Sequence, residues 1–136
     1  IDVDNFKAYN DTYGHPAGDE VLRQIAAVLQ SACRGELDLV ARYGGKVRRY
    51  PADNLYEVAH DVAVRLAAAV RMLDIPHLSS SKGRVTVSIG LASVTGSMSD
   101  PQQLLKSCDQ ALYSAKAAGR DKVRAASVED LTSMTV

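Results

Sequence analysis

The segment that decides the fold of this chain reads DVDNFKAYNDTYGHPAGD and covers residues 2–19. It contains four aspartates, two asparagines and two glycines with little apolar periodicity, which predicts a loop that gathers ligands. Residues 1–4 have the pattern of the end of a buried strand, which would bring Asp2 and Asp4 to the edge of a sheet. Mg²⁺ takes oxygen ligands and usually binds one or two carboxylates together with substrate phosphates. The segment therefore predicts a site for a cation and a phosphate.

Three other side chains of this segment suit a nucleotide. Lys7 carries a charge that would neutralise a phosphate, while Asn10 and Asp19 offer the hydrogen-bonding groups that a nucleobase edge requires. The alternative is an ordinary polar connection whose aspartates cap helices, because a short Asp-x-Asp pattern often occurs by chance.

Together with three later strings, the segment resembles the GGDEF (diguanylate cyclase) domain family. The later strings are RYGG at 42–45, VTVSIG at 85–90 and DQALYSAKAAGR at 109–120, and all four stand in the family's order. The resemblance implies an α+β fold. This fold is a ferredoxin-like palm, similar to nucleotide cyclase and polymerase palms, with a central, mostly antiparallel sheet covered by helices.

The hydrophobic pattern predicts the elements of such a palm. Helices are expected at 18–33, 54–73 and 101–119, and strands at 37–43, 84–94 and 122–124, after the strand end at 1–4. The first helix has an apolar stripe at spacings of three and four residues, which consists of Val21, Leu22, Ile25, Val28 and Leu29.

Composition excludes several classes of function. Lys and Arg total 16, as do Asp and Glu, so no basic field favours a nucleic acid polymer or an anionic membrane surface. No apolar run approaches the length of a membrane-spanning helix, and the isolated Cys33 and Cys108 fit a reducing compartment. We expect a cytoplasmic domain, which can belong to a larger and even membrane-anchored protein.

The resemblance also sets the expected domain boundaries. We expect a GGDEF domain at residues 1–127, followed by a tail or linker at 128–136. Family members carry a helix and half a strand before the matched part, so the chain is interpreted as truncated at its N-terminus. An upstream sensory or receiver module would then join two copies into a homodimer.

The family's activity implies roles for particular residues. Diguanylate cyclases join two GTP molecules, each held by one domain, into cyclic di-GMP, with Mg²⁺ polarising the phosphate. By matching position, Asp2 would bind the metal and Val3 would assist through its carbonyl oxygen. The positions implied for GTP are Asn5 and Phe6 through their backbone N–H groups, Lys7, Asn10, Asp19, Gly44, Gly45, Lys116 and Arg120.

Within this set, Asn10 and Asp19 would read guanine, and Lys116 and Arg120 would hold the outer phosphates. The last two stand four residues apart, so they are expected on one face at the end of the last helix. The alternative is that they only stabilise the dipole at the C-terminus of that helix.

The signature loop departs from the family at its acids. Lys46 and Val47 occupy the two acidic positions, and residues 46–51 read KVRRYP. Unpaired charge is costly inside a packed sheet, so this segment is expected at an exposed edge or in a looped-out connection. A cation at this position would also repel Mg²⁺. The family's inhibitory product site is incomplete too. It needs an arginine three positions before Asp38, and Gly35 stands there.

The sequence leaves three interpretations open. The first is a regulatory domain that binds GTP or cyclic di-GMP, with catalysis lost or severely impaired. The second is an active cyclase whose residues 46–50 are misreported, since an out-of-frame reading of 46–51 can encode the apolar strand KFAVIL. The third is a dimerisation module without a ligand, which would not require the retained nucleotide-binding residue types.

Overall fold

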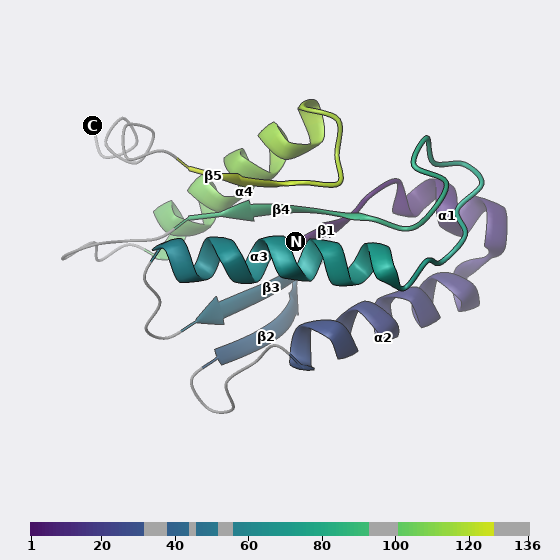
Figure 1. The fold of residues 1–136 in the computed structure, drawn as a ribbon, viewed down its shortest axis with the longest axis horizontal. Helices are drawn as coiled ribbons and strands as arrows, with labels where there is room; N and C mark the ends of the chain where they lie inside the picture. The colour runs from purple at the N-terminus through teal and green to yellow at the C-terminus, as the bar shows by residue number, and fades with distance from the viewer. Residues whose placement is uncertain (32–37, 44–45, 52–55, 93–100, 127–136) are drawn as a thin grey trace.

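The computed structural model describes residues 1–31, 38–43, 46–51, 56–92 and 101–126 (Figure 1). The α+β class is confirmed by its elements. In chain order these are β1 (Asp2–Val3), α1 (Phe6–Tyr13), α2 (His15–Ser31), β2 (Asp38–Tyr43), β3 (Lys46–Pro51), α3 (Tyr56–Met72), β4 (Val87–Leu91), α4 (Pro101–Ala117) and β5 (Val123–Ala125).

The described strands form two hydrogen-bonded units, one of three strands and one of two. β1 pairs antiparallel with β4, which places Asp2 opposite Ser88, and β4 pairs in parallel with β5. β2 and β3 form a separate antiparallel hairpin in which Tyr43 lies opposite Lys46. The segment KVRRYP is therefore a strand that stays outside the three-stranded sheet. This agrees with the desolvation cost that its cations would meet in the middle of a packed sheet.

Helix α1 occupies much of the first segment, so the prediction of a ligand-gathering loop there is wrong. Phe6, Tyr9 and Tyr13 recur at spacings of three and four residues and pack with the core, where Tyr9 is buried. The polar residues between them lie on the remaining surface of the helix and obscure this short apolar stripe. Helix α2 also begins earlier than expected, at His15. Pro16 suits its first turn because no N–H partner is needed there.

The core lies between α2, α3 and one face of β4. The apolar stripe predicted for α2 is confirmed, with Leu22 and Val28 packed against a cluster in which Val21, Ile25 and Leu29 are buried. α3 adds Leu66, Ala67 and Val70, and β4 adds Val87 and Ile89. In Figure 1, α3 crosses in front of the strands and α4 lies behind them. Helices therefore cover both faces of the three-stranded sheet.

The contact between α4 and β4 depends on Gly90. A Cβ atom at this position would lie 2.2 Å from the carbonyl oxygen of Cys108 and 2.5 Å from the backbone nitrogen of Leu112. Both atoms belong to the backbone of α4, which cannot move aside as the end of a side chain can. Only glycine therefore allows the helix to lie this close to the strand.

We expect Gly90→Ala to lower the free energy of unfolding by about 1–3 kcal/mol or more, because it overpacks this contact. Urea denaturation followed by circular dichroism measures the change. Ser114→Ala, on the exposed surface of α4, is the control and should leave the midpoint nearly unchanged. An unchanged midpoint for Gly90→Ala would contradict the close packing of α4 on β4.

Candidate functional site

The acidic end of β1 meets the last turn of α4. The ammonium group of Lys116 forms an ion pair with the carboxylate of Asp2, and their side chains are 33% and 17% exposed respectively. The fold thus brings together the residue expected to bind a metal and one expected to hold phosphate. Because both side chains are partly exposed, an incoming anion can reach the ammonium group.

Asp4, the second carboxylate of this strand end, has a different environment. It is 2% exposed and accepts hydrogen bonds from the Thr86 hydroxyl at 2.7 Å, the Ser88 hydroxyl at 2.6 Å and the Asp121 backbone N–H at 3.0 Å. These donors satisfy a charged group that would otherwise be costly to bury. The expectation that both aspartates reach a sheet edge as ligands therefore fails for Asp4, which joins three segments inside the protein.

A buried histidine holds the start of α1. His77 is fully buried, and its Nε2 lies 3.1 Å from the carbonyl oxygen of Asn5, which has left-handed backbone geometry (φ 55°). A carbonyl oxygen only accepts, so Nε2 carries the proton. The sequence predicted a polar connection at 76–83 and missed this residue, because a single histidine in such a segment has no pattern.

Aromatic rings complete the support of α1. The rings of Tyr9 and His77 meet edge to face with their centroids 5.2 Å apart, and the Tyr13 hydroxyl accepts a hydrogen bond from the Leu78 N–H at 3.1 Å. Burial, and secondarily the nearby Tyr13, raise the pKa of the Tyr9 phenol above its ordinary value. Tyr9 is therefore a neutral packing group at physiological pH.

Asn10, one of the two residues expected to read guanine, lies against Gly18 of α2. A Cβ atom at Gly18 would lie only 1.8 Å from Asn10 Oδ1 and 3.2 Å from Phe6 Cζ. Asn10 Oδ1 is buried and has no hydrogen-bond partner among the described residues. Asp19 follows directly on the same helix and is exposed. The fold therefore places an unsatisfied amide oxygen and an exposed carboxylate at the contact of α1 with α2.

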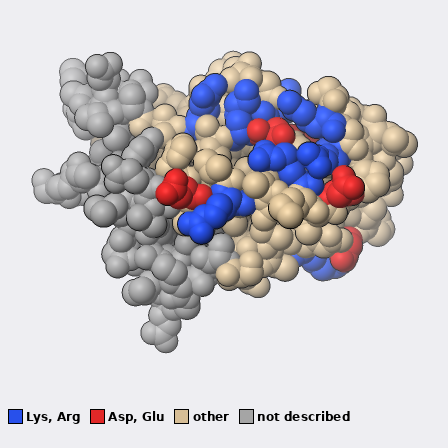
Figure 2. Space-filling model, viewed as in Figure 1, with Lys and Arg blue, Asp and Glu red and all other residues tan. Residues whose placement is uncertain are grey.

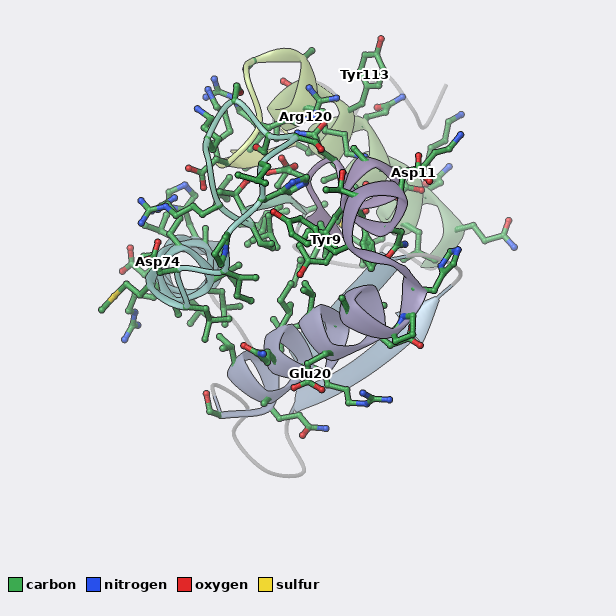
Figure 3. All side chains as sticks on the ribbon, turned by 90° about the vertical axis from the view of Figure 1, so that its right-hand side faces the viewer. Tyr9, Asp11, Glu20, Asp74, Tyr113 and Arg120 are labelled. Atoms are coloured by element: carbon green, nitrogen blue, oxygen red, sulfur yellow. The ribbon has the colours of Figure 1, made fainter. Side chains whose placement is uncertain are left out.

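Arg120 does not share a helical face with Lys116, so that prediction is wrong. Helix α4 ends at Ala117, and Gly119, Arg120 and Asp121 follow with positive φ values of 112°, 63° and 50°. The chain turns here instead of continuing the helix to 119. The Arg120 side chain is exposed on this turn, which lies above α1 in the view of Figure 3.

Charge on this part of the surface is uneven. Figure 2 shows Lys and Arg side chains gathered in the upper right of the view, where Figure 1 draws the turn between α4 and β5 and the segment between α3 and β4. A few acidic groups lie among them. The balanced total charge therefore conceals a locally basic region, which would attract an anion.

The signature loop falls partly outside the described residues. Gly44 and Gly45 lie outside them, as does the segment around Gly35 where an arginine partner for Asp38 would be needed. Lys46 and Val47 begin β3, opposite Tyr43 and Arg42 of β2. The roles assigned to these positions stay predictions.

The described residues do not form a metal site by themselves. They contain no group of three or more His, Cys, Asp or Glu side chains that could hold a metal ion. Asp2 is paired with Lys116, and Asp4 already accepts three hydrogen bonds. Mg²⁺ would thus find one carboxylate and the Val3 carbonyl oxygen on β1, and most of its ligands would have to come from phosphates and water.

Comparison with known proteins identifies the family of the chain. Residues 1–122 match the family model described as the diguanylate cyclase GGDEF domain. The chain belongs to the GGDEF family. Among curated relatives of this GGDEF domain, the response regulator PleD of Caulobacter vibrioides is 42% identical, with alignment over 90% of the chain and 27% of PleD. Diguanylate cyclase DgcM of Escherichia coli is also 42% identical, over 93% of the chain and 30% of DgcM.

Solved structures show the same relationship. The GGDEF domain of DgcB from Caulobacter crescentus, in complex with c-di-GMP, matches 92% of this chain and 74% of that chain, with a TM-score of 0.79 and 31% identity. The active GGEEF domain of a diguanylate cyclase from Vibrio cholerae matches 93% of this chain and 79% of that chain, with a TM-score of 0.70 and 29% identity. The GGDEF fold is therefore established.

The chain aligns with only part of the length of each of these relatives. It spans about a quarter of the length of PleD and about a third of diguanylate cyclase A from Treponema denticola. No helix in the described part of the chain combines the length and the apolar character needed to cross a bilayer.

We expect His77→Ala to lower the free energy of unfolding by about 1–3 kcal/mol, because it removes one of the two donors to the Asn5 carbonyl oxygen, the other being the Tyr9 N–H at 3.0 Å. The new cavity beside Tyr9 should add to this loss. Chemical denaturation measures the effect, and His15→Ala, at an exposed histidine, is the matched control. Equal midpoints for the two variants would contradict a structural role of His77.

Proposed function

We propose that this GGDEF domain binds GTP or cyclic di-GMP as a regulatory module of cyclic di-GMP signalling, with cyclisation severely impaired. The Asp2–Lys116 ion pair carries the proposal, because it brings an acidic strand end and a distant cation to one place. The family uses these residue types at these positions, whereas Lys46 and Val47 stand where its signature acids belong.

The phosphates of a nucleotide would meet cations from several elements. Lys116 would exchange all or part of its contact with Asp2 for phosphate oxygens, since charge-assisted hydrogen bonds to phosphate are strong. Lys7 and Arg120 are exposed and would contribute further positive charge. None of these contacts requires a metal ion, so binding without Mg²⁺ is expected.

The guanine base would meet groups from α1 and α2. Asn10 Oδ1 has no partner among the described residues, and it would accept an N–H from the base once the amide turns away from Gly18. Asp19 is exposed one residue after Gly18 and would accept from the other N–H groups of the guanine edge. Adenine presents a different arrangement of donors and acceptors, so these two groups would favour GTP over ATP.

Cyclisation makes a demand that these residues do not meet. A 3′-hydroxyl must lose its proton and attack phosphorus, and metal ions held by carboxylates normally support this step. With Lys46 and Val47 at the signature positions, the acids are missing, and the loss of one charge-stabilising group alone costs about 10²–10³-fold in rate.

Two other functions remain as alternatives. The first is an active diguanylate cyclase, which is favoured by relatives such as diguanylate cyclase DgcM of Escherichia coli. It would require residues 46–50 of the protein to differ from KVRRY. A dimerisation module without a ligand is the other alternative. The retained residue types at Asp2, Lys7, Asn10, Asp19, Lys116 and Arg120 disfavour it, because a scaffold would not require them.

Calorimetric titration with GTP distinguishes these functions. We expect binding that persists when Mg²⁺ is replaced by EDTA, with no cyclic di-GMP formed on prolonged incubation. Metal-dependent binding with product formation would instead support the active cyclase, and the absence of binding by either GTP or cyclic di-GMP would support the dimerisation module. As a matched variant, Lys46→Asp with Val47→Glu restores the acids and should make GTP binding respond to Mg²⁺.

We expect Gly18→Ala to reduce the preference for GTP over ATP by about tenfold, because its Cβ displaces the Asn10 amide. Competition binding of the two nucleotides measures this preference. Asn10→Ala should have the same effect. Gln30→Ala, at an exposed position of α2, the helix that also carries Gly18, should have none. If the unmodified domain binds ATP as tightly as GTP, the assignment of Asn10 and Asp19 to the base is wrong.

A further inference from the structure

The turn that follows α4 has an unusual backbone. Gly119, Arg120 and Asp121 have consecutive positive φ values of 112°, 63° and 50°. Glycine adopts such angles readily and Asp tolerates them, but Arg is strained in this region. Strained residues persist only where their surroundings hold them. The structure must therefore contain contacts that hold Arg120 and Asp121.

Three hydrogen bonds from different elements hold the turn. The Arg120 N–H donates to the Ala115 carbonyl oxygen in α4, and the Asp121 N–H donates to the buried Asp4 carboxylate, both at 3.0 Å. The third bond is made by the side chain of Asp121, whose Oδ1 accepts from the Arg71 guanidinium group of α3 at 2.8 Å. The carboxylate of Asp121 is thus fixed by α3 while its backbone is fixed by the end of β1.

This last ion pair is more sheltered than an ordinary surface pair. The side chains of Arg71 and Asp121 are 31% and 15% exposed, whereas the pair of Arg23 with Glu20 on α2 is 72% and 57% exposed. Partial burial strengthens such a contact and reduces its screening by salt. The Arg71–Asp121 pair can therefore determine the geometry of the turn.

The turn presents Arg120 without using its side chain internally. The side chain is exposed, and no hydrogen bond or ion pair of its guanidinium group occurs among the described residues. Lys116, the other cation expected at the phosphates, is tied to Asp2. Asp2 on β1 and Asp4 directly after β1 thus set the positions of both cations, Asp2 by direct pairing and Asp4 through the backbone of Asp121.

We infer that Arg71 and Asp121 are positioning residues, which together with Asp4 hold the 119–121 turn so that Arg120 faces the outer phosphates of a bound nucleotide. The inference rests on the proposed function only for the identity of the ligand. The clamp itself follows from the contacts of Asp121 with Asp4 and Arg71. Disruption of the clamp should weaken contacts to the outer phosphates and leave recognition of the base intact.

The first test measures nucleotide binding by Arg71→Gln and Asp121→Asn. We expect the affinity for GTP to fall about tenfold while the affinity for GMP, which lacks the outer phosphates, changes little. Arg71→Lys keeps one charged donor and should restore part of the GTP affinity. Arg124→Gln removes the same charge from an exposed position on β5 and is the control for general electrostatics. A correctly folded clamp variant with an unchanged ratio of GTP to GMP affinity overturns the role at the phosphates.

The second test needs no ligand. Amide hydrogen exchange at Arg120 and Asp121, followed by NMR, should accelerate at least about tenfold in Arg71→Gln and remain unchanged in Arg124→Gln. Unchanged exchange at both amides overturns the clamp even if nucleotide binding is normal. If the unmodified domain binds neither GTP nor GMP, the proposed function fails, and faster exchange in Arg71→Gln still supports the clamp.

Discussion

The rest of the structure depends on one buried carboxylate. Asp4 is 2% exposed and receives hydrogen bonds from Thr86, from Ser88 and from the backbone of Asp121. Because a buried charge without donors would be very costly, these segments are constrained to remain together. The carboxylate therefore fixes β1 against β4 and fixes the turn after α4 against both. Asp2 lies two positions before it on the chain, and Arg120 lies next to one of its donors.

This constraint explains why two aspartates so close in sequence have different roles. Asp2 is partly exposed and pairs with a cation that a ligand can reach, whereas Asp4 has no remaining access to solvent or metal. Residues two apart on a strand face the same side, so the difference comes from their neighbours along the sheet: Asp2 lies opposite Ser88 at the end near Lys116, whereas Asp4 lies between Thr86, Ser88 and Asp121. Of these two residues of one strand end, Asp4 serves structural stability and Asp2 is the one proposed to serve ligand binding.

The cationic segment at residues 46–51 lies apart from the three-stranded sheet of this GGDEF domain. Among the residues whose burial is described, the core is built from α2, α3 and β4, and α4 approaches β4 closely at Gly90. β3, which carries the cationic segment, bonds to β2 and stays outside the three-stranded sheet. The chain resembles a solved GGDEF domain at a TM-score of 0.79, and Lys46 and Val47 follow Gly44 and Gly45 in its sequence. A retained fold does not by itself establish a retained reaction.

Local patterns in the sequence determined the family, the α+β class and the apolar stripe of α2, because helical periodicity and motif spacing are properties of neighbouring residues. Only the tertiary structure decided the burial of Asp4, the role of His77 and the left-handed turn at Arg120. Their partners lie far along the chain: Asn5 is 72 positions from His77, and Asp121 is 117 positions from Asp4. No local pattern records such contacts, since they form only when distant elements pack together.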